Sequence, residues 1–365
     1  MGRTGSNIVN ARSYRQITFS VIHRVGATNS TFTIAQASLC PFVSRRRRVL
    51  LPYDRSRDLI APTVLLLGRL LHALPLTWAL AIGRLFGLVW FYLLPIRRGV
   101  ALANVRRVFG ATLDRRAQRR IVRSAMVNLT TMGVELLQLP WMTRDEAEWR
   151  VRREGFEHLE AGLARGKGVI TVCPHFGSFA SVVASEALRG LKMNAIIKEV
   201  QWGPAQRFWT EVRRHTGIVD IPPRRSSEQI LAALRRNEIV VIMIDQHMPH
   251  YRGIVTELCG QLASTTTAPA RFALETDAFI VPGIALRTGE PGRHILRAEP
   301  GFEVDRRFAT PEANVRATIE RINRVFEHWL REAPEQWLWL HKRWKVQEHP
   351  EGWKIPDELR HLLAS

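Results

Sequence analysis

The stretch that decides the fold is Val169-Ile170-Thr171-Val172-Cys173-Pro174-His175-Phe176-Gly177. Its first four residues predict a compact, β-branched strand that ends at Cys173-Pro174. A second apolar strand, over 239–244, is stopped in the same way by Asp245. Strand and helix patterns alternate on both sides of this pair, which predicts an α/β fold with a mixed central sheet flanked by helices.

Beyond 101–140, a helical region that Pro140 closes, the elements are short and regularly spaced. We expect further strands at 151–153, 193–198, 218–221, 279–286 and 294–298, and helices at 155–164, 176–188, 203–216, 227–236, 267–276 and 310–332.

The charge of the chain narrows the list of partners. Lys and Arg number 53 against 33 Asp and Glu, which leaves a formal net charge of +20 on 365 residues. Such a charge predicts an acidic partner: nucleic acid, anionic lipid headgroups or an acidic carrier protein. We find no helix-turn-helix and no aromatic-studded sheet, and the basic residues are scattered, so a nucleic-acid partner is not expected.

The three cysteines, Cys40, Cys173 and Cys259, form no CxxC pair, and no His cluster has metal-ligand spacing. A disulfide framework or a structural zinc site is therefore not expected, and neither is a cofactor. A reduced, cytoplasm-facing protein is the natural default.

Residues 1–57 differ from the rest of the chain. The first 50 residues contain no Asp or Glu and end near the run Arg45 to Arg48. This composition resembles a transit peptide or a disordered basic tail, and an over-extended start codon is a third interpretation. We expect this extension to take no part in the chemistry.

Residues 58–96 are the most apolar part of the chain, but Arg69 and Arg84 interrupt them. The uncharged runs fall short of the roughly 18–20 residues of a clean membrane span. A single span with a snorkelling Arg, two short helices in the membrane interface and a buried hairpin of a soluble protein all remain open. Residues that suit headgroup level and anionic lipid are Trp78, Trp90, Tyr92, Arg97 and Arg98.

Two reactive residues follow strands directly. His175 comes after the strand at 169–172, and Asp245 comes after the strand at 239–244. Active sites in α/β sheets lie beyond the carboxyl ends of strands, and a His there is well placed as a general base. By pattern alone, a surface histidine and a loop aspartate remain the simpler interpretations. A hydrolase lacks support because no Gly-x-Ser-x-Gly elbow is present, and Cys173 is more simply a small buried hydrophobe.

Five segments in order resemble the bacterial lipid A late-acyltransferase family, within the wider group that carries the HxxxxD/E motif. The resemblance runs from about residue 58 to residue 346, and Asn104 with Val105-Arg106-Arg107 also fits it. The matching segments are His175-Phe176-Gly177-Ser178-Phe179, Asp245-Gln246-His247, Gly260-Gln261-Leu262-Ala263-Ser264-Thr265-Thr266, Val281-Pro282 with Arg287, and the block 334–345.

The resemblance implies a glycerolipid-acyltransferase-like fold and a catalytic His175 with Asp245. It places Phe176, Gly177, Gln246, Thr265 and Thr266 at the substrate, together with Arg213 and with Lys198 where the family often has an Arg. Composition and the resemblance together predict four regions: a basic extension over 1–57, a membrane-associated helical anchor over 58–100, an acyltransferase domain over 101–346 and a C-terminal tail over 347–365.

One departure is serious. The residue five positions after His175 is Ala180, where the family pattern expects Glu or Asp. Losing the carboxylate that orients a catalytic His costs about 10⁴ in rate. Glu186 lies too far along the helix to substitute, so Asp245 is the better candidate, since two neighbouring strand ends can bring it close to His175.

We therefore expect an O-acyltransferase that moves a fatty acyl chain from acyl carrier protein or acyl-CoA to a hydroxyl of a membrane lipid. The acceptor would be a lipid A precursor or a related glycolipid, at the cytoplasmic face of the inner membrane and its anionic surface. Ala180 leaves one alternative, a catalytically silent, membrane-bound lipid-binding relative.

Overall fold

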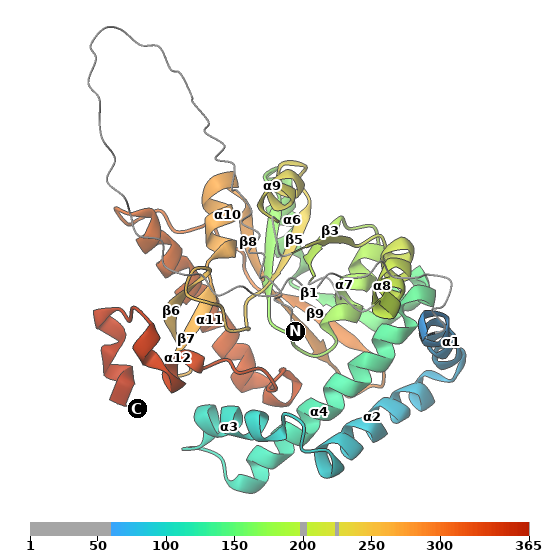
Figure 1. Cartoon of the computed structure of the whole chain (residues 1–365). Helices are drawn as coiled ribbons and strands as arrows, with labels where there is room; N and C mark the ends of the chain where they lie inside the picture. The colour runs from blue at the N-terminus through green and yellow to red at the C-terminus, as the bar shows by residue number, and fades with distance from the viewer. Residues whose placement is uncertain (1–59, 198–202, 223–225, 365) are drawn as a thin grey trace, which may run out of the picture. The chain divides into compact units, whose positions relative to one another are not determined.

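A seven-stranded sheet forms the centre of the protein, in the order β1-β9-β8-β2-β5-β3-β4 (Figure 1). The computed structural model describes residues 60–197, 203–222 and 226–364, which lie within one compact unit. The strands are β1 Val151–Glu154, β2 Val169–Cys173, β3 Met193–Ile196, β4 Val219–Ile221, β5 Ile239–Met243, β8 Phe279–Arg287 and β9 His294–Ala298. Only β8 and β9 pair antiparallel, so the predicted mixed α/β sheet is confirmed.

The two central strands, β2 and β5, end level with each other. Their parallel register pairs Val169 with Ile239 and Cys173 with Met243. Both strands are almost continuously apolar because both faces of the sheet are covered, as parallel sheets require.

Alternate residues of β2 enter different layers of the core. Val169 and Cys173 pack on one side with helices α6 Phe156–Ala164 and α7 Phe179–Leu188. Ile170 and Val172 pack on the other side, in a core to which three helices that follow β4 contribute buried residues. Those helices are α9 Ser227–Arg235, α10 Ala268–Thr276 and α11 Pro311–Glu332.

The chain leaves β2 and β5 on opposite faces of the sheet. After β2 it forms α7, and after β5 it crosses toward α10 on the other face before reaching β8. The carboxyl ends of these two neighbouring strands are therefore the topological switch point of the sheet, where ligands bind in open α/β folds.

Two segments form elements that were not predicted, and one predicted helix begins late. Between Asp245 and residue 267, where no element was predicted, a two-stranded hairpin forms from β6 Gly253–Leu258 and β7 Gln261–Thr266. A short helix, α5 Arg144–Arg150, precedes β1, and α8 Gly203–Thr216 matches its expectation. The helix expected at 176–188 begins only at Phe179, because Gly177 has a φ of 52° that no helix accommodates.

The apolar region at 58–96 forms two helices, α1 Ile60–Ala73 and α2 Leu76–Leu93, followed by α3 Arg98–Phe109 and the long α4 Arg115–Gln138. Helix α2 lies along α4 (Figure 1). Gly83 and Gly87 make this close approach possible, because a Cβ at Gly87 would lie 2.4 Å from the Cα of Val127. By length and composition α2 is also the one described helix that could cross a membrane.

The segment at 347–364, predicted as a tail, packs on the β6–β7 hairpin. Leu359 and Leu362 are buried with Val255 and Leu262 of that hairpin. A short helix, α12 Lys345–Glu348, leads into the segment. The N-terminal extension predicted at 1–57 lies outside the described residues.

Candidate active site

His175 and Asp245 meet at the switch point. Each lies two residues beyond the last pair of the β2–β5 register, so the strands themselves bring them side by side. The Nδ1 atom of His175 lies 2.7 Å from Oδ1 of Asp245. Because a carboxylate only accepts, Nδ1 carries the proton and Nε2 is left as the basic atom. The His175 side chain is 18% exposed and that of Asp245 is 2% exposed, so the imidazole alone can reach a substrate.

The second oxygen of Asp245 is held by two donors. The backbone N–H of His175 donates to Oδ2 over 2.9 Å, and the indole Nε1 of Trp337 donates to it over 2.7 Å. Trp337 belongs to the block at 334–345, called here the C-terminal block. This block pairs with the turn at 175–178, the His turn, through a bridge between Phe176 and Trp337. The backbone N–H of Leu338 also donates to the His175 carbonyl over 3.1 Å. Both carboxylate oxygens are therefore fixed in one orientation.

The charges of the pair stabilise each other. Burial works against a charged imidazole, but the Asp245 carboxylate outweighs it and raises the pKa of His175 above its ordinary value. Burial also works against ionised Asp245, yet His175 and the hydrogen bond from Trp337 lower the pKa of Asp245 to about 2. Asp245 is thus ionised at neutral pH, and neutral His175 becomes the major form only above its raised pKa.

The turn at Gly177 admits no other residue type. Its φ of 52° lies in the left-handed region, and a Cβ there would lie 2.2 Å from the carbonyl oxygen of Ala285. The Gly177 N–H donates to the Gln336 carbonyl over 2.9 Å. Asn128 on α4 donates its side-chain amide to the carbonyls of both Gly177 and Gln336. This glycine keeps the His turn close to β8 and to the C-terminal block.

A buried carboxylate, Glu135 on α4, also supports this turn, through the side chain of Ser178. The hydroxyl of Ser178 donates to it over 2.5 Å, and Arg287 at the end of β8 forms a two-pronged ion pair with it, one arm measuring 2.7 Å. Nε2 of His294 lies 3.2 Å away. Burial would raise the pKa of Glu135, but Arg287 and His294 hold it well below its usual range. This network joins α4, β8, β9 and the His turn into one rigid support.

No acid stands at position 180, and none nearby replaces it along the helix. Ala180 is partly buried in the first turn of α7. Glu186, two turns further on, is held by Arg153 and by Arg189. The position on Nδ1 that a motif acid would take is instead occupied by Asp245.

The remaining predicted residues are placed as follows. Gln246 is exposed beside the pair, at the rim of the site. Thr265 is fully buried and accepts a hydrogen bond from the buried Arg343, while Thr266 accepts one from the Ala268 N–H. Both threonines thus have packing roles in the hairpin, and their contact with substrate stays a prediction.

Of the two predicted cations, Arg213 and Lys198, only Arg213 lies within the described residues. Arg213 on α8 pairs with Asp220 on the edge strand β4, with β3 between that strand and β5, so the structure does not bring it to His175. Lys198 lies outside the described residues.

An apolar slot begins beside the His turn and runs under α7. It is lined by Thr171 and Cys173 from β2, by Val281, Gly283 and Ala285 from β8, and by Phe179, Val182 and Glu186 from α7. Phe179 also packs its ring edge against His175, with centroids 4.9 Å apart. Burial and the nearby Asp245 raise the pKa of Cys173 well above its usual range, which suits a wall of this slot and not a nucleophile.

The sequence patterns did not predict the roles of two residues that support the site, Trp337 and Glu135. Trp337 was quoted within the C-terminal block, but no periodic pattern indicated that its indole would anchor Asp245. Glu135 carried a weak signal, since it is a lone acid between Val134 and Leu136 on an amphipathic helix. Within the described residues, no group of three or more His, Cys, Asp or Glu side chains could hold a metal ion.

The site thus combines a His–carboxylate pair at the switch point of an α/β sheet with an apolar slot beside it. A family model described as bacterial lipid A biosynthesis acyltransferase matches residues 53–346. The match covers well over half of the chain. The protein therefore belongs to the bacterial lipid A biosynthesis acyltransferase family, a family of acyltransferase enzymes.

Individual relatives are distant. The chain is 24% identical over 238 residues to the lipid A biosynthesis lauroyltransferase of Escherichia coli K12, covering 62% of this chain and 72% of that protein. It is 22% identical over 186 residues to the lipid A biosynthesis acyltransferase of Haemophilus influenzae, covering 51% and 56%. A phosphatidylinositol mannoside acyltransferase of Mycobacterium tuberculosis (strain CDC 1551) is 22% identical over 216 residues, covering 58% and 66%. The matched segments thus span roughly half to three quarters of these relatives.

Proposed function

We propose that this protein is an active O-acyltransferase that moves a fatty acyl chain from a thioester donor to a hydroxyl of a membrane glycolipid. One observation carries the proposal: Asp245 binds Nδ1 of His175 at 2.7 Å and so leaves Nε2 as a base, although the usual motif position holds Ala180. The dyad is complete, but its acid comes from β5 instead of α7.

The reaction follows from this geometry. Neutral His175 takes the proton of the acceptor hydroxyl at Nε2 while the hydroxyl oxygen attacks the thioester carbonyl. Asp245 stabilises the imidazolium that forms, as the acid does in a Ser-His-Asp triad. The carbon–sulfur bond then breaks, and the imidazolium returns its proton to the departing thiolate.

The slot under α7 suits the alkyl chain of the donor. Its wall is apolar apart from Thr171 and Glu186, and it includes Cys173, Pro174 and Phe179, which lie next to His175 in the sequence. Gly283 is the wall position without a side chain, and a Cβ there would lie 3.3 Å from Thr171. A larger residue at 283 would fill the slot, so Gly283→Val should reduce transfer of long chains more than transfer of short ones.

For the donor we propose acyl carrier protein or acyl-CoA. Both are acidic, and the net charge of +20 favours either. For the acceptor we propose a lipid A precursor or a related glycolipid, in line with the names of relatives that include a lipid A lauroyltransferase and a phosphatidylinositol mannoside acyltransferase. Lys198, Arg213, Gln246, Thr265 and Thr266 remain proposed substrate contacts.

We place the enzyme at the cytoplasmic face of the inner membrane, with the α1–α2 hairpin lying in the interface. The outer face of this hairpin is apolar: Trp78, Leu85 and Phe86 are 61–68% exposed. Its inner face is packed on α4 through Gly83 and Gly87, which supports an in-plane helix over a spanning one. Replacing Leu85 and Phe86 by Glu should release the protein from vesicles without unfolding it; unchanged sedimentation with vesicles would refute this anchor.

The direct test is acyl transfer by the full chain, with isotope-labelled acyl carrier protein and acyl-CoA offered separately to total bacterial lipids and products read by mass spectrometry. Wild type should give a new acylated lipid whose mass names acceptor and chain length, and His175→Ala should give none. If folded wild type forms no product from either donor, the silent lipid-binding alternative suggested by Ala180 replaces this proposal.

A further inference from the structure

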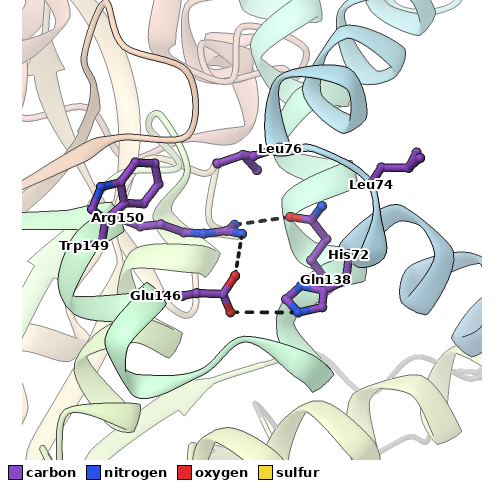
Figure 2. Close-up of a pocket in the computed structure, with 7 residues that line it drawn as sticks. All are labelled: His72, Leu74, Leu76, Gln138, Glu146, Trp149 and Arg150. Atoms are coloured by element: carbon purple, nitrogen blue, oxygen red, sulfur yellow. Dashed lines mark hydrogen bonds and ion pairs between the residues drawn. The ribbon is translucent and has the colours of Figure 1, made fainter.

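A polar pocket of about 200 Å³ lies away from the His175–Asp245 pair, where the α1–α2 connection meets α4 and α5 (Figure 2). The side chains around it converge on Arg150, the last residue of α5. The residues that line it are His72, Leu74, Leu76, Gln138, Glu146, Trp149 and Arg150.

Arg150 is a buried guanidinium whose acceptors, Gln138 and Glu146, lie at long distances. The residue is 5% exposed, so water does not compensate its charge. Its bond to Oε1 of Gln138 measures 3.2 Å, its nearest approach to Glu146 is 3.5 Å, and its Nε has no partner. Charge-assisted pairs normally measure about 2.7–2.9 Å. The pocket therefore offers unused donors on a fixed positive charge.

The acid nearest to Arg150 is committed elsewhere. Oε2 of Glu146 accepts the backbone N–H of Thr143 over 2.8 Å, which closes the capping box of α5. The same oxygen lies 3.9 Å from Nε2 of His72. Glu146 is therefore held by the cap through Oε2 and faces Arg150 only through Oε1, at 3.5 Å.

A helix start adds to the positive potential. Helix α2, which has 18 residues, begins at Leu76 in the pocket wall, and its N-cap, Pro75, makes no side-chain capping bond. The free N–H groups of a first helical turn attract anions. Nδ1 of His72, at the end of α1, is buried and also unpartnered.

The rim of the pocket is apolar and belongs partly to the anchor hairpin. Leu74 is 38% exposed and Trp149 is 53% exposed. The guanidinium of Arg293 lies 4.7 Å from the Trp149 ring centre, which keeps this aromatic side chain at the rim. An anion that enters here would meet apolar surface continuous with the outer face of α1 and α2.

We propose that this pocket binds the phosphate group of an anionic lipid headgroup, with Arg150 as its main donor and the start of α2 beside it. The apolar rim favours a lipid phosphate over free phosphate. This headgroup site would fix the depth and rotation of the hairpin at the membrane. It does not depend on the proposed chemistry at His175.

The test is isothermal titration of the full chain with dihexanoyl phosphatidic acid below its micelle concentration, and separately with inorganic phosphate. Arg150→Gln should weaken binding of the short-chain lipid at least tenfold. The matched control is Arg144→Gln, which removes the same charge from the same helix at an exposed side chain paired with Glu148; its binding should stay within twofold of wild type.

Because Arg150 is buried, His72→Asn provides a second variant at a partly exposed position, and it should weaken binding about threefold with an unchanged thermal midpoint. His175→Ala should bind like wild type, which separates this test from that of the enzyme. Equal losses in Arg144→Gln and Arg150→Gln would reduce the effect to general charge and overturn the site. Binding of inorganic phosphate as tight as that of the lipid would overturn the lipid assignment, and no binding of either by wild type would overturn the proposal.

Discussion

The turns that follow β2 and β5 each supply half of the proposed dyad, but they are fixed in different ways. The backbone of the His175 turn is held by Asn128 of α4 and by the carbonyl of Gln336, and Glu135 of α4 accepts a hydrogen bond from the Ser178 side chain. In the Asp245 turn the carboxylate accepts hydrogen bonds from His175 and Trp337, and the backbone that follows is held by His341, which accepts the His247 N–H. The His turn has contacts that do not involve Asp245, whereas the Asp245 side chain is oriented by the residues that donate to it.

The motif position of the acid holds Ala180, yet a carboxylate still lies against the imidazole. The HxxxxD/E pattern places the base on the turn after a strand and the acid on the helix that follows. In this chain only the base, His175, occupies its motif position. A neighbouring strand end in register reaches the same ring nitrogen. In the proposed mechanism, Ala180 marks a relocated acid and not a dead site.

The largest effect should come from removing the base. His175→Ala should lower the rate of acyl transfer by about 10²–10⁴-fold, the usual contribution of a general base. The fold should survive, since backbone bonds and not the imidazole hold the turn. Transfer measured by mass spectrometry on protein with a wild-type thermal midpoint checks this, and retained activity would sink the mechanism.

The free energy of unfolding of a Gly177 variant tests how firmly the His turn is held. Gly177→Ala forces an L-residue into a left-handed conformation and against the Ala285 carbonyl, so it should destabilise the protein by at least about 1–3 kcal/mol. Gly133→Ala is the matched control, because it lies within α4 with no atom near the added Cβ, and it should stabilise by about 0.5–1 kcal/mol. Denaturant unfolding measures both, and a neutral Gly177→Ala would show that the turn is not rigid.

A smaller effect is expected where Asp245 is supported. Trp337→Phe keeps the aromatic packing but removes the indole donor to Oδ2. A hydrogen bond to a charged group contributes about 1.5–3 kcal/mol, so a loss of roughly tenfold in kcat is expected with KM little changed. The steady-state rates of the two proteins test this, and a change in KM alone would assign Trp337 to substrate binding.

The smallest effect should come from restoring the motif acid. Ala180→Glu should leave the rate within about threefold of wild type, because Nδ1 of His175 already has its carboxylate partner. A large gain in rate would mean that Asp245 does not do the work of the missing acid. A collapse, with the thermal midpoint retained, would mean that a second carboxylate competes for the same imidazole.

Much of this arrangement could be predicted from local sequence. The β2 and β5 strands, with His175 and Asp245 at their ends, follow from short apolar runs and the residues that stop them. The pairing of these two residues was a hypothesis about strand order, and the structure brings them together through a register that no local pattern contains.

What the sequence could not provide depends on contacts between distant segments. The β6–β7 hairpin carries Thr, Ser and Gln, which read as a loop. Thr256 and Thr265 of this hairpin accept hydrogen bonds from the distant side chains of Asn323 on α11 and of Arg343. Trp337 reaches Asp245 across 92 positions of the chain. Residues such as these become interpretable only once the C-terminal block is seen to wrap around the strand ends.

The most direct test of the central claim is the pH dependence of kcat/KM for wild type and Asp245→Asn with the same donor and acceptor. The base is the neutral imidazole, so the wild-type value should rise with pH through a midpoint above the ordinary His value of about 6.5. Without the carboxylate only burial acts on His175, so Asp245→Asn should move the midpoint below that value and lower the plateau by up to about 10⁴-fold. An Asp245→Asn enzyme with an unchanged plateau and midpoint would contradict the account, because His175 would then work without the acid from β5.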